Sequence, residues 1–420
     1  MRLLRRSAHR NDISISQDEV IIFMGFLLGF LLIIPSLKSN FTIDYYQYWT
    51  VAKAVGEAET DNIYTKRERN RIGKLYLKKI QETASSDHHK VVAKFRQSLE
   101  PAGTPFLYTV FYALNSGDYD TDYNRFRWVS LVFYLAGLLL LCRTLGFSYP
   151  VSLFSFVIFA SPWFGPFEGD LTAGNINQFQ LGALALTVVL KGWAQNTQGL
   201  LRPALYFVCG MIMGFLLMLK PNVIYAVTLL LVLWFMEGAK NDRSGLAGGF
   251  VVSCVLAYIS SALFFGFFGC WFSWIRFFSK LTGFYQARSL LGLVGLALPR
   301  FVHWGLGLTA VLFLIKRVKG KILPHRDVFL WGAGFMIYLL TAPLVHHHYF
   351  IHALPLTLYL LRPKNDHSAG KLGLMTVALF FLFSEFVPVV VPYKLPNHVH
   401  GFIAISLLNA LTVPIIIRMK

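Results

Sequence analysis

Long apolar segments recur along almost the whole chain, and they constrain its fold more than any other feature. A transmembrane helix needs about 20 predominantly apolar residues. Inside a bilayer the backbone must satisfy its own hydrogen bonds, so such segments form helices. The sequence predicts an all-α, polytopic integral membrane protein with about 12 transmembrane helices. The predicted spans are residues 20–37, 126–143, 149–166, 175–192, 203–219, 221–237, 247–269, 301–315, 328–345, 349–361, 372–390 and 399–417.

Composition excludes several other classes of protein. Hydrophobic residues make up 55% of the chain, which is more than a soluble domain can hide beneath a polar surface. The net charge of +18 would suggest nucleic acid in a soluble protein, but here the bases serve membrane orientation, so we expect no nucleic-acid partner. The four cysteines have no CxxC or ligand-like spacing, which argues against a disulfide framework and a zinc site.

The distribution of Lys and Arg predicts the orientation. With the N-terminus placed in the cytoplasm, 19 of the 39 bases fall in inner segments and six in short outer segments. The other 14 lie in one long loop, and long loops are translocated largely regardless of charge. No small-residue cleavage site follows residues 20–37, so we interpret them as a retained first helix. Both termini are therefore expected on the cytoplasmic side of a bacterial plasma (inner) membrane.

The loop of residues 38–125 is the main feature expected outside the membrane, within a single domain of residues 1–420. Residues 65–94 are charged and favour helix, so we expect one or two helices lying on the membrane surface. The apolar positions expected to face lipid or protein are Ile72, Leu75, Leu77 and Ile80. The run 106–114 is too short to span.

Asp44 is the first candidate for chemistry on the predicted outer side. It follows the first span closely and is adjacent to Tyr45 and Tyr46. Partial desolvation at a membrane surface raises the pKa of a carboxylate and makes it a better proton acceptor near neutral pH. The alternative is a solvated loop acid beside an interfacial belt of aromatic side chains.

A second polar cluster begins the fourth predicted span from the same side. It consists of Glu168, Asp170, Asn175, Asn177 and Gln178. Amides and free N–H groups on the first turns of a membrane helix can bind an anion or hydroxyl groups. The alternative is helix capping together with hydrogen bonds between helices.

Cations and histidines complete the predicted outer site. Lys220 lies in a tight outer turn, where it can pair with a phosphate or simply extend to the interface. The His346–His348 triplet suits contacts with phosphate or hydroxyl groups, or it is simply an interfacial cluster. The segment contains no carboxylate and no HExxH pattern, which argues against a metal site. Three further bases suit a lipid phosphate or act as interfacial anchors: Arg276, Lys280 and Arg288.

The order of these motifs resembles glycosyltransferase family 87 of the GT-C superfamily. The resemblance covers roughly residues 20–360. Its motifs are Asp44-Tyr45-Tyr46, Thr104-Pro105-Phe106-Leu107, Gly174-Asn175-Ile176-Asn177, Leu219-Lys220-Pro221, and Ala342 to His348 followed by Pro355. The chain differs in having Asn175 where the family typically has Gln, one loop proline rather than two, and three histidines rather than two.

The resemblance implies an inverting sugar transfer with Asp44 as general base. The donor would be a polyprenyl-phosphate-linked sugar (mannose or another hexose or pentose) on the outer face, and the acceptor a lipid or a glycan. Lys220, the histidine triplet, Arg276, Lys280 and Arg288 would then bind the donor, and Tyr45, Tyr46 and the second cluster the acceptor or sugar. No cofactor and no metal are expected.

Two other functions fit the same spans. A transporter or lipid flippase would carry out no covalent chemistry, but it predicts charged or broken helices near the bilayer midplane, and Glu385 is the main acid inside the predicted spans. A polymer ligase or acyltransferase would use His346–His348 and would not need Asp44. Substituting Asp44 separates these readings.

Overall fold

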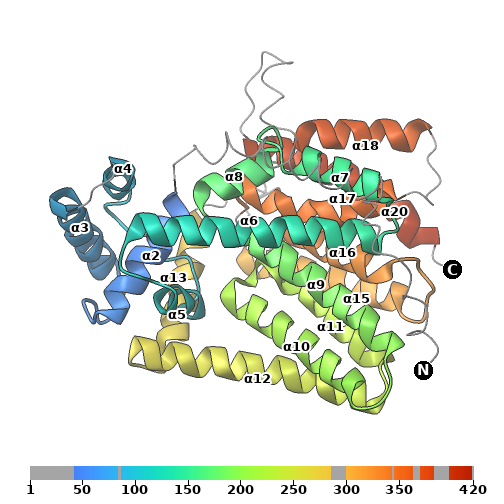
Figure 1. The fold of residues 1–420 in the computed structure, drawn as a ribbon, viewed down its shortest axis with the longest axis horizontal. Helices are drawn as coiled ribbons and strands as arrows, with labels where there is room; N and C mark the ends of the chain where they lie inside the picture. Colours follow the sequence, from blue (N-terminus) through green and yellow to red (C-terminus); the bar gives the residue numbers. More distant parts are fainter. Residues whose placement is uncertain are drawn as a thin grey trace, which may run out of the picture.

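The computed structural model describes residues 42–83, 87–284, 299–342, 345–362, 369–382 and 397–418, and the regular structure in these ranges is entirely helical (Figure 1). The predicted first span, residues 20–37, lies outside the described residues, as does Arg288.

Five of the described helices are long and apolar enough to cross a membrane. They are α6 (Tyr119–Thr144), α10 (Leu201–Leu219), α12 (Lys240–Phe265), α15 (Arg300–Val318) and α20 (Asn397–Arg418). Each covers most or all of a span predicted from the sequence. The chain is therefore an α-helical membrane protein, and the count of about 12 spans stays a prediction.

Three predicted spans are divided into shorter helices, among them 221–237, which becomes η2 (Pro221–Val223) and α11 (Ile224–Glu237). The segment 149–166 becomes α7 (Tyr149–Phe159) and the start of α8 (Gly165–Ala173), and proline explains the break. Pro162 follows the end of α7, and Pro166 occupies the first turn of α8, where its missing N–H costs nothing. The segment 349–361 likewise becomes a 3₁₀ helix and a short α-helix. The remaining elements in this part of the chain are α9 (Asn177–Asn196), α13 (Cys270–Phe284), α16 (Arg326–Thr341), η4 (His347–Ala353), α17 (Leu354–Leu361) and α18 (Ala369–Leu382).

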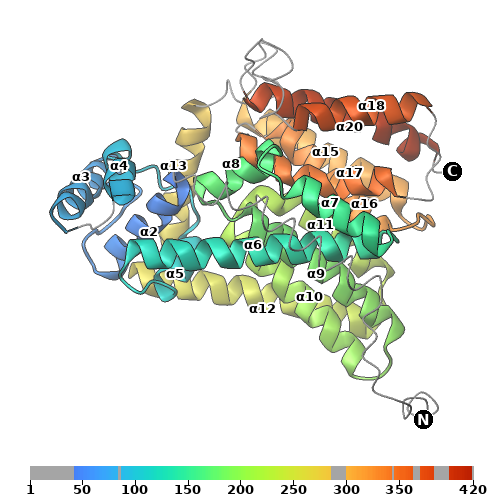
Figure 2. The same ribbon diagram turned by 45° about the horizontal axis from the view of Figure 1, so that its top comes forward.

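The long loop contains more helix than expected and lies at one end of the bundle (Figures 1 and 2). Its helices are α2 (Ile43–Gly56), α3 (Lys66–Thr83), α4 (Asp87–Phe95) and α5 (Pro105–Ala113). Ile72 and Ile80 are buried, and Leu75 and Leu77 pack against the same hydrophobic cluster. These positions face protein because the loop builds an aromatic core of its own.

Two hydrophobic cores therefore exist in the described part of the chain. One fills the bundle and includes Trp331 and Tyr338; the other lies beneath α2–α5 and includes Tyr48 and Leu107. Residues from both cores line one polar cavity. The candidate site is thus located where the loop core meets the bundle.

Glycines hold α10 against α12 at close range. A Cβ atom on Gly210 would collide with the backbone oxygen of Leu246, and one on Gly249 with that of Phe207. Both helices carry two glycines four residues apart, the spacing that lets membrane helices approach closely. This packing fixes the end of α10, where Lys220 lies.

Charged residues tie the helices together at the opposite end of the bundle. Lys191 of α9 binds Asp327 of α16 at 2.7 Å, and Arg202 of α10 binds Asp242 of α12 at 2.7 Å. The α9 helix begins beside the polar cavity and ends near these pairs, and α10 runs back from them. The predicted inner bases Lys191 and Arg202 thus lie far from the predicted outer residues.

Candidate functional site

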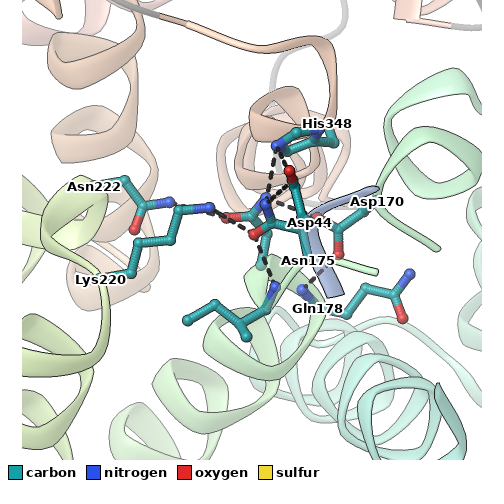
Figure 3. A network of polar contacts seen from close by, with 9 residues as sticks. Asp44, Asp170, Asn175, Gln178, Lys220, Asn222 and His348 are labelled. Atoms are coloured by element: carbon teal, nitrogen blue, oxygen red, sulfur yellow. Dashed lines mark hydrogen bonds and ion pairs between the residues drawn. The ribbon is translucent and has the colours of Figure 1, made fainter. Parts of the chain in front are cut away.

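Four elements distant in sequence bring polar side chains together at the loop end of the bundle (Figure 3). Asp44 comes from the first turn of α2, Asn175 from the junction of α8 and α9, Lys220 from the end of α10, and His348 from η4. All four line a cavity of about 490 Å³. The structure thus joins the residues that the sequence placed on one side of the membrane.

Gly174 sets the direction of the α8–α9 junction. It ends α8 with a φ of +70°, a left-handed conformation that glycine adopts without strain. A Cβ atom at this position would lie 2.5 Å from the Cβ of Tyr45 in α2. The absent side chain therefore allows α2 to approach the junction and places Asn175 next to Asp44.

Asn175 is the centre of the hydrogen-bond network. Its Nδ2 donates to Asp44 Oδ2 at 2.6 Å and lies 3.2 Å from Nε2 of His348. Its Oδ1 accepts from Nζ of Lys220 at 2.5 Å and from the backbone N–H of Ile176 at 2.8 Å. Because a lysine ammonium can only donate, the amide oxygen must face Lys220 and the amide nitrogen must face Asp44.

The same reasoning indicates a neutral His348. The two N–H groups of the Asn175 amide serve Asp44 and His348, so Nε2 of His348 accepts and the ring is neutral with its proton on Nδ1. Burial also lowers the pKa of His348 well below its ordinary value, and the neighbouring His346 adds to this effect. Nε2 of His348 lies 3.9 Å from Asp44 Oδ2, so His348 is a histidine of the triplet that lies next to Asp44.

Lys220 is the cavity cation that belongs to the Asn175 network. Besides Asn175, its Nζ contacts Oδ1 of Asn177 at 3.3 Å and lies 4.3 Å from the centre of the Tyr349 ring. Burial lowers the pKa of Lys220, while Asp44 and Asp170 oppose that shift through their charges. Its hydrogen-bond acceptors are neutral amides, so no direct ion pair cancels its charge within the described residues.

Thr104 explains how the end of α10 is held. Its hydroxyl donates to the backbone oxygens of Met218 and Leu219, at 2.6 and 2.9 Å, and also caps α5 by accepting from the N–H of Leu107. These carbonyls lack partners within the helix because α10 ends there. The loop motif around Thr104 and Pro105 therefore positions Lys220, although neither residue lines the cavity.

Asp170 is a buried acceptor that orients residues of the network. It is 1% exposed and accepts from Asn177 Nδ2 at 2.7 Å and from the backbone N–H of Gln178 at 3.1 Å. Burial raises the pKa of Asp170, and the charge of Lys220 opposes the shift. Asn177 in turn accepts from Asn222 Nδ2 at 2.9 Å. Asp170 and Asn177 therefore act as positioning residues.

Asp44 is the carboxylate of the Asn175 network that lines the cavity. Its side chain is 23% exposed. Oδ2 is held by Asn175, whereas Oδ1 has no hydrogen-bond partner among the residues that the structure describes. One oxygen is thus fixed in direction while the other is free to accept a proton from a bound molecule.

Several residues predicted for the site lie elsewhere. Tyr45 and Tyr46 are buried in the aromatic loop core, and His347 does not line the cavity, although His346 does. The side chains of Glu168 and Gln178 are also outside the cavity lining. In Figure 3 the Gln178 side chain points away from Asp44, and only its backbone takes part in the network.

The predicted cations are divided between two places. Lys220 lines the Asp44 cavity, whereas Arg276 and Lys280 line a neighbouring pocket between α3 and α13. The two pockets share Leu281. Lys220 and Arg276 therefore cannot be assigned to one phosphate site, because they line separate pockets.

Other cavity residues were not foreseen. Tyr48 and Tyr349 are aromatic walls, and Arg96 and Glu100 form an ion pair of 3.2 Å at the rim. Helical spacing could have revealed Tyr48, because it lies four residues after Asp44 and shares its helix face. Arg96 and Glu100 follow α4 and reach the cavity only through tertiary folding.

Within the described ranges, no group of three or more His, Cys, Asp or Glu side chains is placed to hold a metal ion. No protein-family model, no curated protein and no solved structure matches the chain.

Proposed function

We propose that the chain is a membrane glycosyltransferase that moves a sugar from a polyprenyl-phosphate donor to a hydroxyl group of a lipid or glycan acceptor. Asp44 acts as general base and the anomeric carbon inverts. One observation carries this proposal. A carboxylate with one free oxygen and a partly buried ammonium converge on the same amide, that of Asn175, within one cavity.

The step requires a base and an anion site, and the cavity offers both. The acceptor oxygen forms a bond to the anomeric carbon, and the bond between that carbon and the phosphate oxygen breaks. The bonding pair leaves with the phosphate, and the hydroxyl proton passes to Oδ1 of Asp44. A hydroxyl is a weak nucleophile, so a positioned base contributes about 10²–10⁴-fold.

Lys220 is suited to the leaving phosphate. Its charge is held by neutral amide oxygens and by the face of Tyr349, so it remains available for an incoming anion. Interactions with charge that develops in the transition state are the ones that accelerate a reaction. His346, on the same cavity wall, supplies a further polar contact.

The Asn175 amide keeps base and cation apart. A direct ion pair between Asp44 and Lys220 would lower the basicity of the carboxylate and neutralise the ammonium. The intervening amide lets both charges act on a substrate held between them. The same residues carry the resemblance to glycosyltransferase family 87, which supports this assignment of roles.

The bases at the far end of the bundle support our proposal for the side of the membrane. Lys191 and Arg202 lie at the end opposite Asp44, and cytoplasmic segments are enriched in Lys and Arg. We therefore place the cavity on the outer side of a bacterial plasma membrane, where lipid-linked sugars are presented after flipping.

The test is transfer of labelled sugar from a polyprenyl-phosphate hexose by the purified chain in lipid nanodiscs. Asp44→Asn keeps the size of the side chain and removes the base, so turnover should fall about 10²–10⁴-fold while donor binding is retained. Asp61→Asn, at an exposed loop acid outside the cavity, is the matched control and should leave turnover unchanged. Equal turnover for Asp44→Asn and wild type would refute the role of Asp44.

A further inference from the structure

A second pocket, of about 590 Å³, lies between α3 and α13. Four of its lining residues are cations: Lys66, Arg69, Arg276 and Lys280. No acidic residue lines it among the residues described. A third pocket, beside α2 and α3, instead mixes Lys53 and Lys79 with acids, so the charge of the α3–α13 pocket is not a general property of this basic protein.

The wall formed by α13 is one continuous helix face. Ser273, Arg276, Phe277 and Lys280 are spaced by three and four residues, which places them on the same side of the helix. Nδ2 of Asn62 donates to Oγ of Ser273 at 3.3 Å and ties the segment before α3 to this face. The pocket is therefore built by contacts between two segments more than 200 residues apart.

Arg69 is held in place but retains unused donors. Its guanidinium carbon lies 4.6 Å from the centre of the Phe277 ring, and its Nη1 reaches the backbone oxygen of Leu99 at 3.5 Å. Its Nε is buried and has no hydrogen-bond partner in the described structure, and the same is true of the hydroxyl of Tyr64, another wall residue. A buried donor without an acceptor is costly unless a ligand supplies one.

None of the four cations forms an ion pair within the described ranges; Arg69 alone interacts with an acid at longer range, through the charge of Glu100. Glu68 pairs with Arg71 at 2.6 Å, on the outer side of the helix. Gathering four like charges around one pocket without an ion pair to any of them is unfavourable, and a bound anion lowers that cost. The positive end of the α3 helix dipole, at Thr65 and Lys66, adds to the attraction.

We propose that the α3–α13 pocket binds the phosphate group of an anionic membrane lipid, at a site separate from the Lys220 cavity. Lysine and arginine bind phosphate through charge-assisted hydrogen bonds. Apolar side chains accompany the cations on α13, where Phe272 and Ile275 are 68% and 50% exposed. A lipid could therefore place its phosphate in the pocket and its chain against this exposed apolar surface.

The experiment measures binding to the full chain in detergent micelles by native mass spectrometry. The probes are phosphatidic acid, which carries a phosphate monoester, phosphatidylcholine, which has no net charge, and inorganic diphosphate. Wild type should retain phosphatidic acid in preference to phosphatidylcholine. The variant Arg276→Gln/Lys280→Gln should bind phosphatidic acid about tenfold or more weakly, because two charge-assisted bonds are removed.

The matched control is Arg67→Gln/Lys74→Gln, which removes the same charges from exposed positions of α3 that do not line the pocket. It should bind like wild type. Competition by inorganic diphosphate at equal concentration would identify free phosphate rather than the lipid as the ligand and would overturn the lipid assignment. Equal binding by wild type and the pocket variant would overturn the site itself. Asp44→Asn should bind phosphatidic acid normally, so a failure of the proposed transfer activity is distinguished from a failure of this site.

Discussion

The Asp44 cavity and the α3–α13 pocket both contain cations, but the cations differ in whether protein groups bind them. In the cavity, Lys220 is bonded to Asn175 and Asn177, and the amides extend to Asp44 and Asp170. In the pocket, Arg276 and Lys280 are exposed and have no partners among the described residues. The first arrangement fixes charges relative to each other, which suits chemistry. The second leaves charges to be satisfied by a ligand, which suits binding.

The difference also concerns stability. A buried polar network stabilises the fold only while each member keeps its partners, and removal of one member exposes the others to an uncompensated cost. Exposed cations without partners contribute little and repel each other. Substitutions in the two places should therefore differ in their effects on both turnover and unfolding.

The largest contrast is expected in sugar transfer. Lys220→Met removes the cation that faces the leaving phosphate, and kcat/KM for the polyprenyl-phosphate donor should fall about 10²-fold or more. Lys280→Gln, in the other pocket, should change kcat/KM less than about threefold, since it does not touch the Asp44 cavity. Comparable losses from the two substitutions would show that the pockets do not have separate roles.

A second contrast concerns the free energy of unfolding. Asn175→Ala leaves Asp44, Lys220 and His348 without their shared partner, so the protein should lose about 1–3 kcal/mol. Asn196→Ala, at the exposed end of α9, breaks a bond to the backbone oxygen of Gly192 and should cost less than about 0.5 kcal/mol. Thermal unfolding in one detergent measures the loss of stability in both variants. Equal losses would show that Asn175 does not hold the network together.

The pH dependence of transfer should reveal the burial of Lys220. Burial lowers its pKa, so the ammonium loses its proton at a lower pH than an exposed lysine, whose pKa is near 10.5. The protonated form exists below this lowered pKa, so kcat/KM should decline as the pH rises through it. Lys220→Arg keeps its charge at every accessible pH, and its residual activity should decline only at higher pH. An identical alkaline decline in both proteins would assign it to another group.

The smallest effect is expected for the stability of the α3–α13 pocket. Arg276→Gln/Lys280→Gln breaks no bond between described residues and relieves repulsion, so unfolding without added lipid should change by less than about 0.5 kcal/mol. Phosphatidic acid should raise the unfolding temperature of wild type and not that of the variant, because only a ligand bound to the folded state stabilises it. A large loss without lipid would indicate that these cations are structural.

Sequence reasoning succeeded where one strong physical constraint acts. The bilayer demands long apolar helices, and α6, α10, α12, α15 and α20 all correspond to predicted spans. The convergence of Asp44, Asn175, Lys220 and His348 was also anticipated, because residues at the same ends of antiparallel spans share one side of a bundle.

It failed where tertiary packing decides. Tyr45 was expected in the site as a neighbour of Asp44, but consecutive residues on a helix point about 100° apart, so Tyr45 enters the loop core while Tyr48 faces the cavity. No span is predicted for residues 270–284, where the structure has the helix α13. Its amphipathic face forms a pocket only when the segment that leads into α3 packs against it.

We propose that the Asp44 cavity, and not the α3–α13 pocket, holds the reacting donor. A structure of the Asp44→Asn chain with a bound polyprenyl-phosphate hexose tests this directly. We expect a phosphate oxygen within hydrogen-bond distance of Nζ of Lys220, and the anomeric carbon facing residue 44 with room for a hydroxyl between them. A donor whose phosphate lies at Arg276 and Lys280, with its sugar remote from residue 44, would contradict it.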